Sequence, residues 1–497
     1  MLLFSCSVII CIITAFKHEM WGDEAQAFLI ARDSHSFIDL FNNVRYEGHP
    51  YLWYLIIKLS IYFIPHFYVI QVLNVVFATA IFTVIYFFSP FSALQKFLIA
   101  SSYFISFEWV VVSRSYALGV FLLLLAVALH ERLNQDNKFI FIAVALGLAI
   151  NSSAHAMIVA VLLAAYIFLY AVKTKSSFRR LFRGKKLAGI CIICISLALY
   201  FIQTFPPADR LGEEKIHHWN APATDKIAYS LKNLTKGFFF IQRTVQDQAI
   251  WQNDMVVNKY FSGAMHGGRS VSDIFYLVAG LSVFLLTSFF LKQKEALLFY
   301  IGTTVVLFIG NYGSPYGLSL RHCGFYFLTL IMAFWLNKGS VAASSKLNII
   351  LGGVLILQFF SSVIIHIAEW KLPFSNAKMT AKYLKDNHLD TLKVLGHFWQ
   401  TSPVIAYTGT KKYVLIESGT ETSFIKLDTI QHNKNLNANL HPERFMEVAK
   451  KTGAEILLLL PADSIPIPES MGYKRLATFN KPAIQFYEKY VIYQKMP

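Results

Sequence analysis

Acidic and histidine side chains gather at both ends of one short polar stretch near the start of the chain. Asp23 and Glu24 lie at its first end, and Glu47 and His49 lie at its second, each beside an apolar run. A carboxylate at a membrane surface is costly to desolvate and so tends to have a partner or a role. Asp23 and Glu24 could instead begin an amphipathic helix, whose dipole favours acidic residues there.

Later apolar runs also carry polar side chains at their ends. Arg114 and Tyr116 stand at the start of one run, and Arg321 and His322 at the start of another. An arginine in this position is also a common interfacial anchor. His155 follows an Asn-Ser-Ser turn, where a lone histidine is more often a hydrogen-bonding partner than a reactive group.

The signals for metal, redox or nucleotide chemistry are weak. The adjacent pairs Glu213-Glu214 and His217-His218 offer metal ligands, but neighbouring residues of one loop are poor evidence for a site. All five cysteines lie in or beside apolar runs, which indicates packing. No phosphate-binding loop or dinucleotide fingerprint occurs in a supporting context, so we expect no nucleotide cofactor.

The composition requires a membrane. Hydrophobic residues make up 55% of the 497 positions, charged residues only 15%, and the mean hydropathy is +0.48. The net charge is +16, and much of the excess of basic residues lies in short loops between apolar runs, where the positive-inside rule places it. Nucleic acid is therefore not an expected partner.

About eleven membrane spans are predicted. They lie near residues 2–16, 67–88, 95–112, 115–131, 138–151, 155–172, 187–205, 272–291, 296–311, 322–337 and 347–367. The apolar segment 51–64 is too short to cross the membrane. The basic loops all fall on the cytoplasmic side, with the candidate residues outside, only if this segment stays at the interface. The first outer loop is then 17–66, and the large outer loop 206–271 contains an amphipathic stretch, 225–241, that could lie on the membrane over the site.

From residue 369 onward the apolar residues come in short bursts. We predict helices at 376–387 and 442–452 and strands at 392–395, 413–416, 455–460 and 484–493. The fold class is thus an α-helical polytopic membrane domain, residues 1–368, followed by a soluble extracytoplasmic α/β domain, residues 369–497.

Three motifs make the membrane part resemble the GT-C class of glycosyltransferases. They are W-G-D-E-A-Q-A-F and E-G-H-P-Y-L-W-Y at the two ends of the first outer loop, and S-R-S-Y-A-L at 113–118. They are similar to motifs of protein O-mannosyltransferases and of the lipid A aminoarabinose transferase, and most similar to bacterial members with a DEAQAW-like first loop. The C-terminal domain adds only a general similarity.

This resemblance implies roles for individual residues. Asp23 matches the family acid that serves as general base or helps to bind a divalent metal ion, and Glu24 is the adjacent alternative. Family donors are polyprenyl-phosphate sugars, so Arg114, Arg321 and His322 are expected to hold the donor phosphate. The remaining candidates are Glu47, His49, Glu108, Tyr116 and His155.

Glu108 departs from the family pattern. Many relatives carry an acid two residues before the matching arginine, a position that Val112 occupies here. Glu108 stands six residues before Arg114 and could be a second acid or an ion-pair partner of Arg114.

The expected activity is transfer of a sugar from a polyprenyl-phosphate donor to an acceptor hydroxyl on the outer face of a bacterial plasma membrane, with the N-terminus cytoplasmic. Membrane lipid and an acceptor glycan, lipid or protein are the expected partners. Two alternatives stay open: a flippase or transporter of lipid-linked sugars, and a non-catalytic scaffold of the same fold. No motif specifies the sugar, the acceptor or the oligomeric state.

Overall fold

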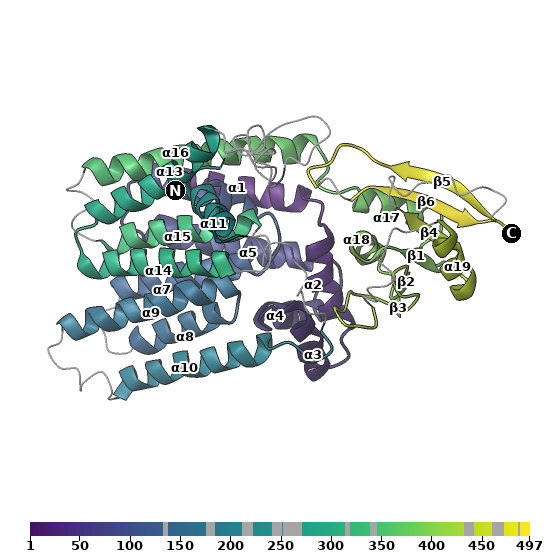
Figure 1. The fold of residues 1–497 in the computed structure, drawn as a ribbon, viewed down its shortest axis with the longest axis horizontal. Helices are drawn as coiled ribbons and strands as arrows, with labels where there is room; N and C mark the ends of the chain where they lie inside the picture. Colours follow the sequence, from purple (N-terminus) through teal and green to yellow (C-terminus); the bar gives the residue numbers. More distant parts are fainter. Residues whose placement is uncertain are drawn as a thin grey trace.

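The computed structural model has a long helical bundle with a smaller α/β domain at one end (Figure 1). It describes residues 1–132, 138–174, 184–210, 222–240, 251, 271–313, 319–337, 345–431, 442–459, 472–485 and 488–497. The pairs Glu213-Glu214 and His217-His218 lie outside the described residues, as do large parts of the outer loop 206–271.

Helices occupy all eleven predicted spans. They are α1 Leu2–Lys17, α5 Val69–Thr83 with the π-helix η1 Val84–Phe88, α6 Ala93–Ala100 with the π-helix η2 Phe104–Glu108, α7 Tyr116–Arg132, α8 Lys138–Ile150, α9 Ala154–Thr174, α10 Gly184–Thr204, α13 Val271–Phe290, α14 Lys294–Gly313, α15 Leu320–Leu336 and α16 Ser345–Lys371. Most run side by side along the length of the bundle (Figure 1).

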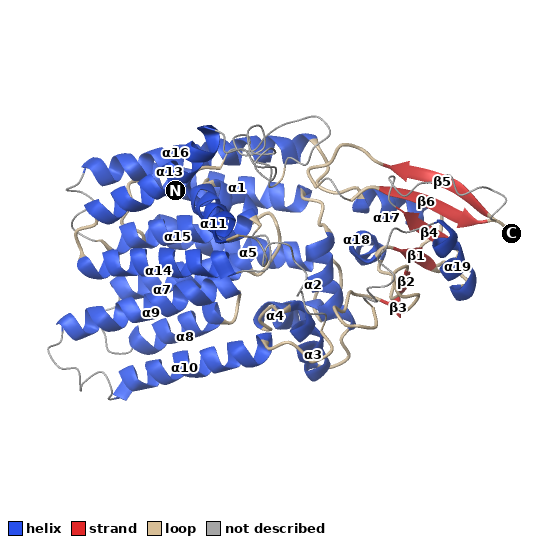
Figure 2. Cartoon of the chain, viewed as in Figure 1, coloured by secondary structure: helices blue, strands red, loops and turns tan. Residues whose placement is uncertain are grey.

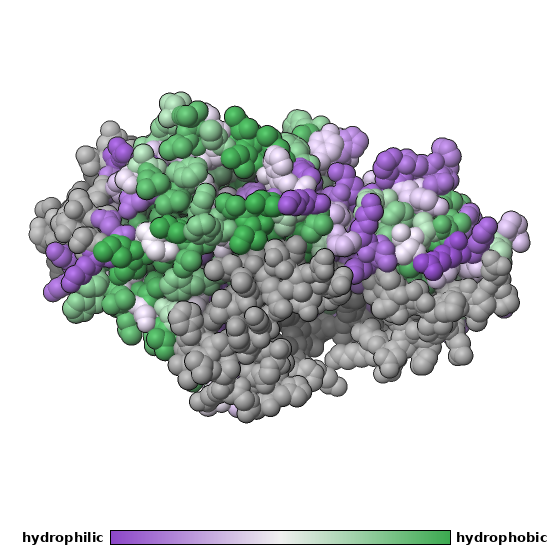
Figure 3. Space-filling view, turned by 90° about the horizontal axis from the view of Figure 1, so that it is seen from above, coloured by the Kyte–Doolittle hydropathy of each residue, from purple (hydrophilic) through white to green (hydrophobic). Residues whose placement is uncertain are grey.

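The bundle has the surface of a multi-pass membrane protein. Among the described residues, five helices are long and apolar enough to cross a membrane alone, and the bent pair of α1 and α2 would make a sixth. Large apolar side chains point outward, among them Phe289, which is 80% exposed. Figure 3 shows hydrophobic residues gathered over the bundle and hydrophilic ones over the C-terminal domain.

The predicted span 95–112 is broken, which corrects the expectation of one continuous helix. Residues 109–115 after η2 are not helical. The amide of Asn74, on α5, donates to the carbonyls of Trp109, Val110 and Val112 at 2.9 to 3.2 Å. These bonds satisfy backbone groups that an irregular segment would otherwise bury unpaired, and they fix the segment that carries Arg114.

Three short helices of the first outer loop cover the end of the bundle. They are α2 Gly22–Asp33, α3 Phe37–Glu47 and α4 Leu52–Ile61. The chain bends by 79° between α1 and α2. With ten residues α4 is too short to cross, as predicted for this segment, and it buries Trp53, Tyr54 and Ile57.

Helix α11, Ala223–Phe238, corrects a further expectation. The sequence suggested that this amphipathic stretch could lie on the membrane over the site. Instead α11 packs against α13, α14 and α15, and its face with Asn233, Leu234 and Phe238 is buried.

The C-terminal α/β domain follows α16, which confirms the predicted fold class. Its sheet runs β3-β2-β1-β4-β6-β5 (Figure 2), with strands β1 Val394–Gly396, β2 Tyr413–Leu415, β3 Glu421–Thr422, β4 Ile456–Leu459, β5 Tyr473–Phe479 and β6 Tyr490–Lys495. Strand β1 is parallel to both β2 and β4, and the other pairings are antiparallel. Helices α17 Ala377–Asp386 and α19 Pro442–Thr452 match the prediction, whereas α18 Phe398–Thr408, β3 and β5 were missed.

This domain packs against the helices of the first outer loop and forms hydrogen bonds with them. One apolar cluster includes Phe28 of α2, Trp53 of α4 and Ile405 of α18. The side-chain amide of Gln26 donates to the carbonyl of Ile425 at 2.6 Å and accepts from its N–H at 3.0 Å. The small domain therefore packs onto the same helices that carry Asp23 and Glu47.

We predict that Asn74→Leu destabilises the protein by ~1–3 kcal/mol or more, because it leaves buried carbonyls without a donor at similar side-chain volume. Thermal unfolding of the detergent-solubilised protein measures the loss. Asn43→Leu is the control, since Asn43 hydrogen-bonds only to the side chains of Ser34 and Asp39 on the first loop. Equal unfolding temperatures for the two variants would show that Asn74 does not hold the segment.

Candidate functional site

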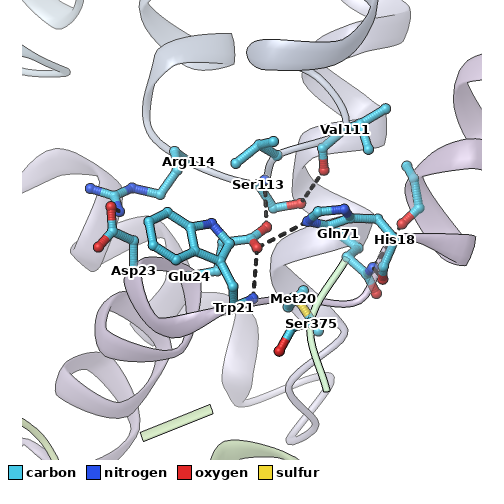
Figure 4. Close-up of polar contacts among 12 residues, drawn as sticks. His18, Met20, Trp21, Asp23, Glu24, Gln71, Val111, Ser113, Arg114 and Ser375 are labelled. Carbon is cyan, nitrogen blue, oxygen red and sulfur yellow. Dashed lines mark hydrogen bonds and ion pairs between the residues drawn. The ribbon is translucent and has the colours of Figure 1, made fainter. Parts of the chain in front are cut away.

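The two adjacent carboxylates of the first loop point in different directions (Figure 4). Glu24 is fully buried, and its carboxylate accepts from the backbone N–H groups of Trp21 at 3.1 Å and Ser113 at 2.6 Å. It also contacts His18 at 3.1 Å, and His18 reaches Glu369 on α16 at 3.2 Å. Glu24 thus joins α1, α2 and the segment before α7, a position that favours a structural role over the predicted catalytic one.

His18 completes this buried network as a cation. Burial by itself lowers the pKa of His18, but the carboxylates of Glu24 and Glu369 outweigh it and raise that pKa to about 10. The side chain of Gln71 fixes the same bend by donating to the carbonyls of Ala15 and His18 at 2.7 and 2.9 Å. The bend between α1 and α2 is therefore held by charge as well as by hydrogen bonds.

Asp23 faces the opposite way and lies between two arginines. Its Oδ2 is 2.6 Å from Nη1 of Arg114 and 2.9 Å from Nη2 of Arg321. Arg114 lies just before α7, and Arg321 lies in the first turn of α15. The structure thus brings together three predicted residues that are up to 298 positions apart.

The charges around Asp23 keep it ionised. Burial raises the pKa of Asp23, but the guanidinium groups of Arg114 and Arg321 outweigh it, so the net pKa is below the usual value. Such a carboxylate is a weak base, and its held charge orients the two arginines.

Some hydrogen-bond donors of the Arg321 guanidinium group have no acceptor among the described residues. Its Nε and Nη1 are buried and make no hydrogen bond within the described part of the chain. Buried donors of this kind are costly unless a ligand satisfies them. Because both arginines stand at helix N-termini, the helix dipoles add to the attraction for an anion.

Glu47 and His49 lie in the same electrostatic environment. Burial raises the pKa of Glu47 to about 7, although the hydrogen bond that its carboxylate accepts from Gln26 at 2.9 Å lowers it. Burial, and after it the charge of Arg114, lower the pKa of His49 to about 3, so His49 is neutral. Glu47 is therefore the carboxyl group of the site whose pKa suits proton transfer near neutral pH.

Arg210 belongs to the site but was not predicted. Its guanidinium lies beside Gly48, where an added Cβ would meet Nη2 at 3.1 Å and where φ is +70°. It contributes to the electrostatics of both Glu47 and His49, and its buried Nε makes no hydrogen bond among the described residues. The sequence holds Arg210 in a long polar loop with no motif around it, so only the fold could reveal it.

Tyr116, His155 and His322 form a second group next to Arg321. Tyr116 and His322 share a hydrogen bond of 2.8 Å, and the rings of His155 and His322 stack at 4.4 Å. The Arg321 guanidinium lies 5.9 Å from the ring of Tyr116. The structure thus joins these predicted residues to the arginines through aromatic contacts.

Glu108 is not an ion-pair partner of Arg114, which corrects that expectation. Its Oε2 accepts from the hydroxyl of Tyr103 at 2.6 Å and from the indole N–H of Trp251 at 2.9 Å. Trp251 packs in turn on Trp21, with ring centroids 4.9 Å apart. Glu108 is fully buried and helps to fix the aromatic wall behind the site.

The residues around Asp23 do not make a metal-binding set. Among the described residues, no three His, Cys, Asp or Glu side chains converge as metal ligands. The nearest partners of Asp23 are guanidinium groups, which compete with a cation for its oxygens. A metal ion at Asp23 stays a prediction.

We define the arginine cluster as Asp23, Glu47, His49, Arg114, Arg210 and Arg321. Three permanent positive charges face one ionised carboxylate, a carboxyl group that titrates near neutrality and a neutral histidine. The surplus positive charge, with donors on Arg321 and Arg210 that no residue in the described ranges accepts from, suits a phosphate group.

No protein-family model matches the chain, and no curated protein matches its sequence. Among solved structures, the fold is similar to that of ArnT from Cupriavidus metallidurans bound to undecaprenyl phosphate, with 10% identity and a TM-score of 0.46. It is also similar to the apo state of that protein, with 9% identity and a TM-score of 0.44. Each match covers 99% of this chain and 97% of the other. At this level of likeness, the function of the chain has to be inferred from its own residues.

We predict that Asp23→Asn lowers stability far more than Asp386→Asn does. Asp23 and its arginines are only partly exposed, so we expect a loss between the ~0–1 kcal/mol of an exposed pair and the ~3–5 kcal/mol of a fully buried one. Asp386 pairs with Lys382 at 2.7 Å on the surface of α17 and is the matched control. Urea unfolding in detergent compares the two, and an added phosphate ligand should stabilise Asp23→Asn more than Asp386→Asn, because the loss of the carboxylate leaves two guanidinium groups without their anion. Equal losses for both variants would contradict the buried pairing.

Proposed function

We propose that the protein transfers a sugar from a polyprenyl-phosphate donor to an acceptor hydroxyl at the outer face of a bacterial plasma membrane. The observation that carries the proposal is Asp23 held between Arg114 and Arg321, with two buried donors of Arg321 that have no hydrogen-bond partner among the described residues. The motifs that resemble those of GT-C glycosyltransferases contain Asp23 and Arg114, and the resemblance also implies Arg321 as a phosphate-binding residue. The site lies where apolar helices meet a polar domain, as an enzyme acting on a lipid-linked sugar needs.

The arginines are proposed to hold the leaving phosphate. As the bond between the anomeric carbon and the phosphate oxygen breaks, the phosphate takes the electron pair and its negative charge rises. Arg114 and Arg321 stabilise that charge, because guanidinium groups bind phosphate oxygens through fixed pairs of donors. Asp23 holds both groups in place before the donor arrives.

Glu47 is proposed as the general base in place of Asp23. The acceptor oxygen bonds to the anomeric carbon while its proton passes to a carboxylate. The low pKa of Asp23 makes it a poor proton acceptor, whereas the pKa of Glu47 lies at about 7. Glu47 interacts electrostatically with Arg114 and Asp23, so it belongs to the same cluster as the phosphate site.

The proposed orientation puts the arginine cluster and the C-terminal domain outside the cell. Helices α8, α10 and α14 begin near lysines at the other end of the bundle, as positive-inside topology requires. Lys138, Lys186 and Lys292 mark that end. The N-terminus is then cytoplasmic.

The direct test is transfer from radiolabelled polyprenyl-phosphate sugars by the purified protein, with membrane extract as acceptor. We expect Arg321→Gln to lower kcat/KM by ~100-fold or more, since it removes a charged donor from the developing phosphate charge. Arg45→Gln is the control, because Arg45 hydrogen-bonds to the carbonyl of Phe205 at the exposed edge of the first loop. Movement of the donor between leaflets without any transfer would instead support a flippase.

We further predict that kcat/KM rises as the pH passes through about 7, because the raised pKa of Glu47 keeps it protonated, and inactive as a base, below that pH. Glu47→Gln should lower the rate by ~100-fold or more and remove this rising limb. His49→Gln should keep the limb, since His49 does not titrate near pH 7. A limb that survives in Glu47→Gln would rule out Glu47 as the base.

A further inference from the structure

A cavity lies far from the arginine cluster, at the opposite end of the bundle. It has a volume of about 490 Å³ and is lined by the first half of α8, the last half of α9 and the first half of α10. Lys186 lines it, whereas the other end of α10 reaches the first outer loop, where Gln203 accepts a hydrogen bond from the N–H of Tyr51. Roughly 25 Å of helix separates these two ends, so this cavity is not part of the proposed active site.

The cavity exists because α8 holds two helices apart. Helix α8 packs against both α9 and α10 and lies between them (Figure 1), and only 11% of the apolar stretch of α10 is buried. The contact of α10 with α8 is close, since a Cβ at Gly189 would meet the carbonyl of Phe139 at 3.2 Å. Small side chains, Ala143, Ala164 and Ala165, line the space between α9 and α10.

The lining chemistry is apolar with one charged rim. Apart from Lys186 and Cys194, all lining side chains are hydrocarbon or glycine. The Lys186 ammonium lies 5.3 Å from the ring of Phe139, and the Lys138 ammonium lies 5.9 Å from the same ring. Lys186 is thus the one charged residue that lines the cavity, on the side that the positive-inside rule places in the cytoplasm, whereas Lys138 lies near the same ring without lining the cavity.

We propose that this cavity binds an anionic glycerophospholipid, with an acyl chain between α9 and α10 and the headgroup phosphate beside Lys186. The volume lies within the ~300–1,000 Å³ typical of small-molecule sites. An apolar cavity that opens toward lipid loses contacts if it stays empty, and acyl chains are the apolar groups that a membrane supplies. Basic pockets between helices on the cytoplasmic side favour anionic headgroups over neutral ones.

The test uses photoactivatable phosphatidylglycerol and phosphatidylcholine, each with a diazirine in one acyl chain, and the full-length protein in nanodiscs. Mass spectrometry counts labelled peptides from α8 and α10. We expect phosphatidylglycerol to label them roughly fivefold more than phosphatidylcholine does, the ratio set by one lysine beside an anionic headgroup. Lys186→Gln should abolish the excess, and Lys292→Gln, an exposed lysine at the same end but outside the cavity, should not.

A second variant distinguishes lipid bound in the cavity from lipid attracted to the basic surface. Ala165→Phe projects a ring into the cavity and should reduce labelling of these peptides by both lipids. Unfolding temperatures matching that of the unmodified protein show that each variant is folded. Equal labelling by the two lipids in the unmodified protein, an excess that survives Lys186→Gln, or labelling unchanged by Ala165→Phe would each overturn the proposal.

Discussion

The buried carboxylate of Glu24 is the interaction on which the site depends. It accepts hydrogen bonds from two backbone N–H groups and pairs with His18, so it holds the bend between α1 and α2 and the non-helical segment before α7 at once. A buried charge is stable only when every oxygen is satisfied. Because Glu24 is fixed inward, its neighbour Asp23 must face outward toward the arginines. The different surroundings of the adjacent residues Asp23 and Glu24 therefore follow from the burial of Glu24.

The C-terminal domain also helps to hold α2 in position. Glu488 accepts a hydrogen bond from the N–H of Gly22 at 2.7 Å, at the first turn of α2, and a second from the hydroxyl of Ser375. Burial raises the pKa of Glu488 to about 8, although these hydrogen bonds lower it. Since α2 carries Asp23, the soluble domain positions the arginine cluster as well as covering it.

The two ends of the bundle present different environments for negative charge. At the end that carries the C-terminal domain, three arginines surround a partly polar site with carboxyl groups among them, so charge can develop and be neutralised there. At the opposite end, Lys186 stands at the rim of an apolar cavity, where an anion has little to react with. The first arrangement suits a phosphate that leaves during a reaction, and the second suits a lipid that stays.

The sequence alone determined the membrane class and the positions of the helices. Apolar runs of span length have no stable place in water, so composition and periodicity fixed all eleven helical regions and most elements of the C-terminal domain. Asp23, Arg114 and Arg321 also stood out in the sequence, because charged residues at the ends of apolar runs are costly without a partner or a role.

Only the tertiary structure showed which of these residues lie together. The sequence favoured Asp23 as the base, whereas the two arginines beside Asp23 lower its pKa and burial raises that of Glu47, which is why we propose Glu47 for that role. Arg210 was missed because its neighbours in space, Gly48 and Asp428, are distant in the chain. A pKa and an ion pair depend on distances between elements, and spacing along one chain does not contain those distances.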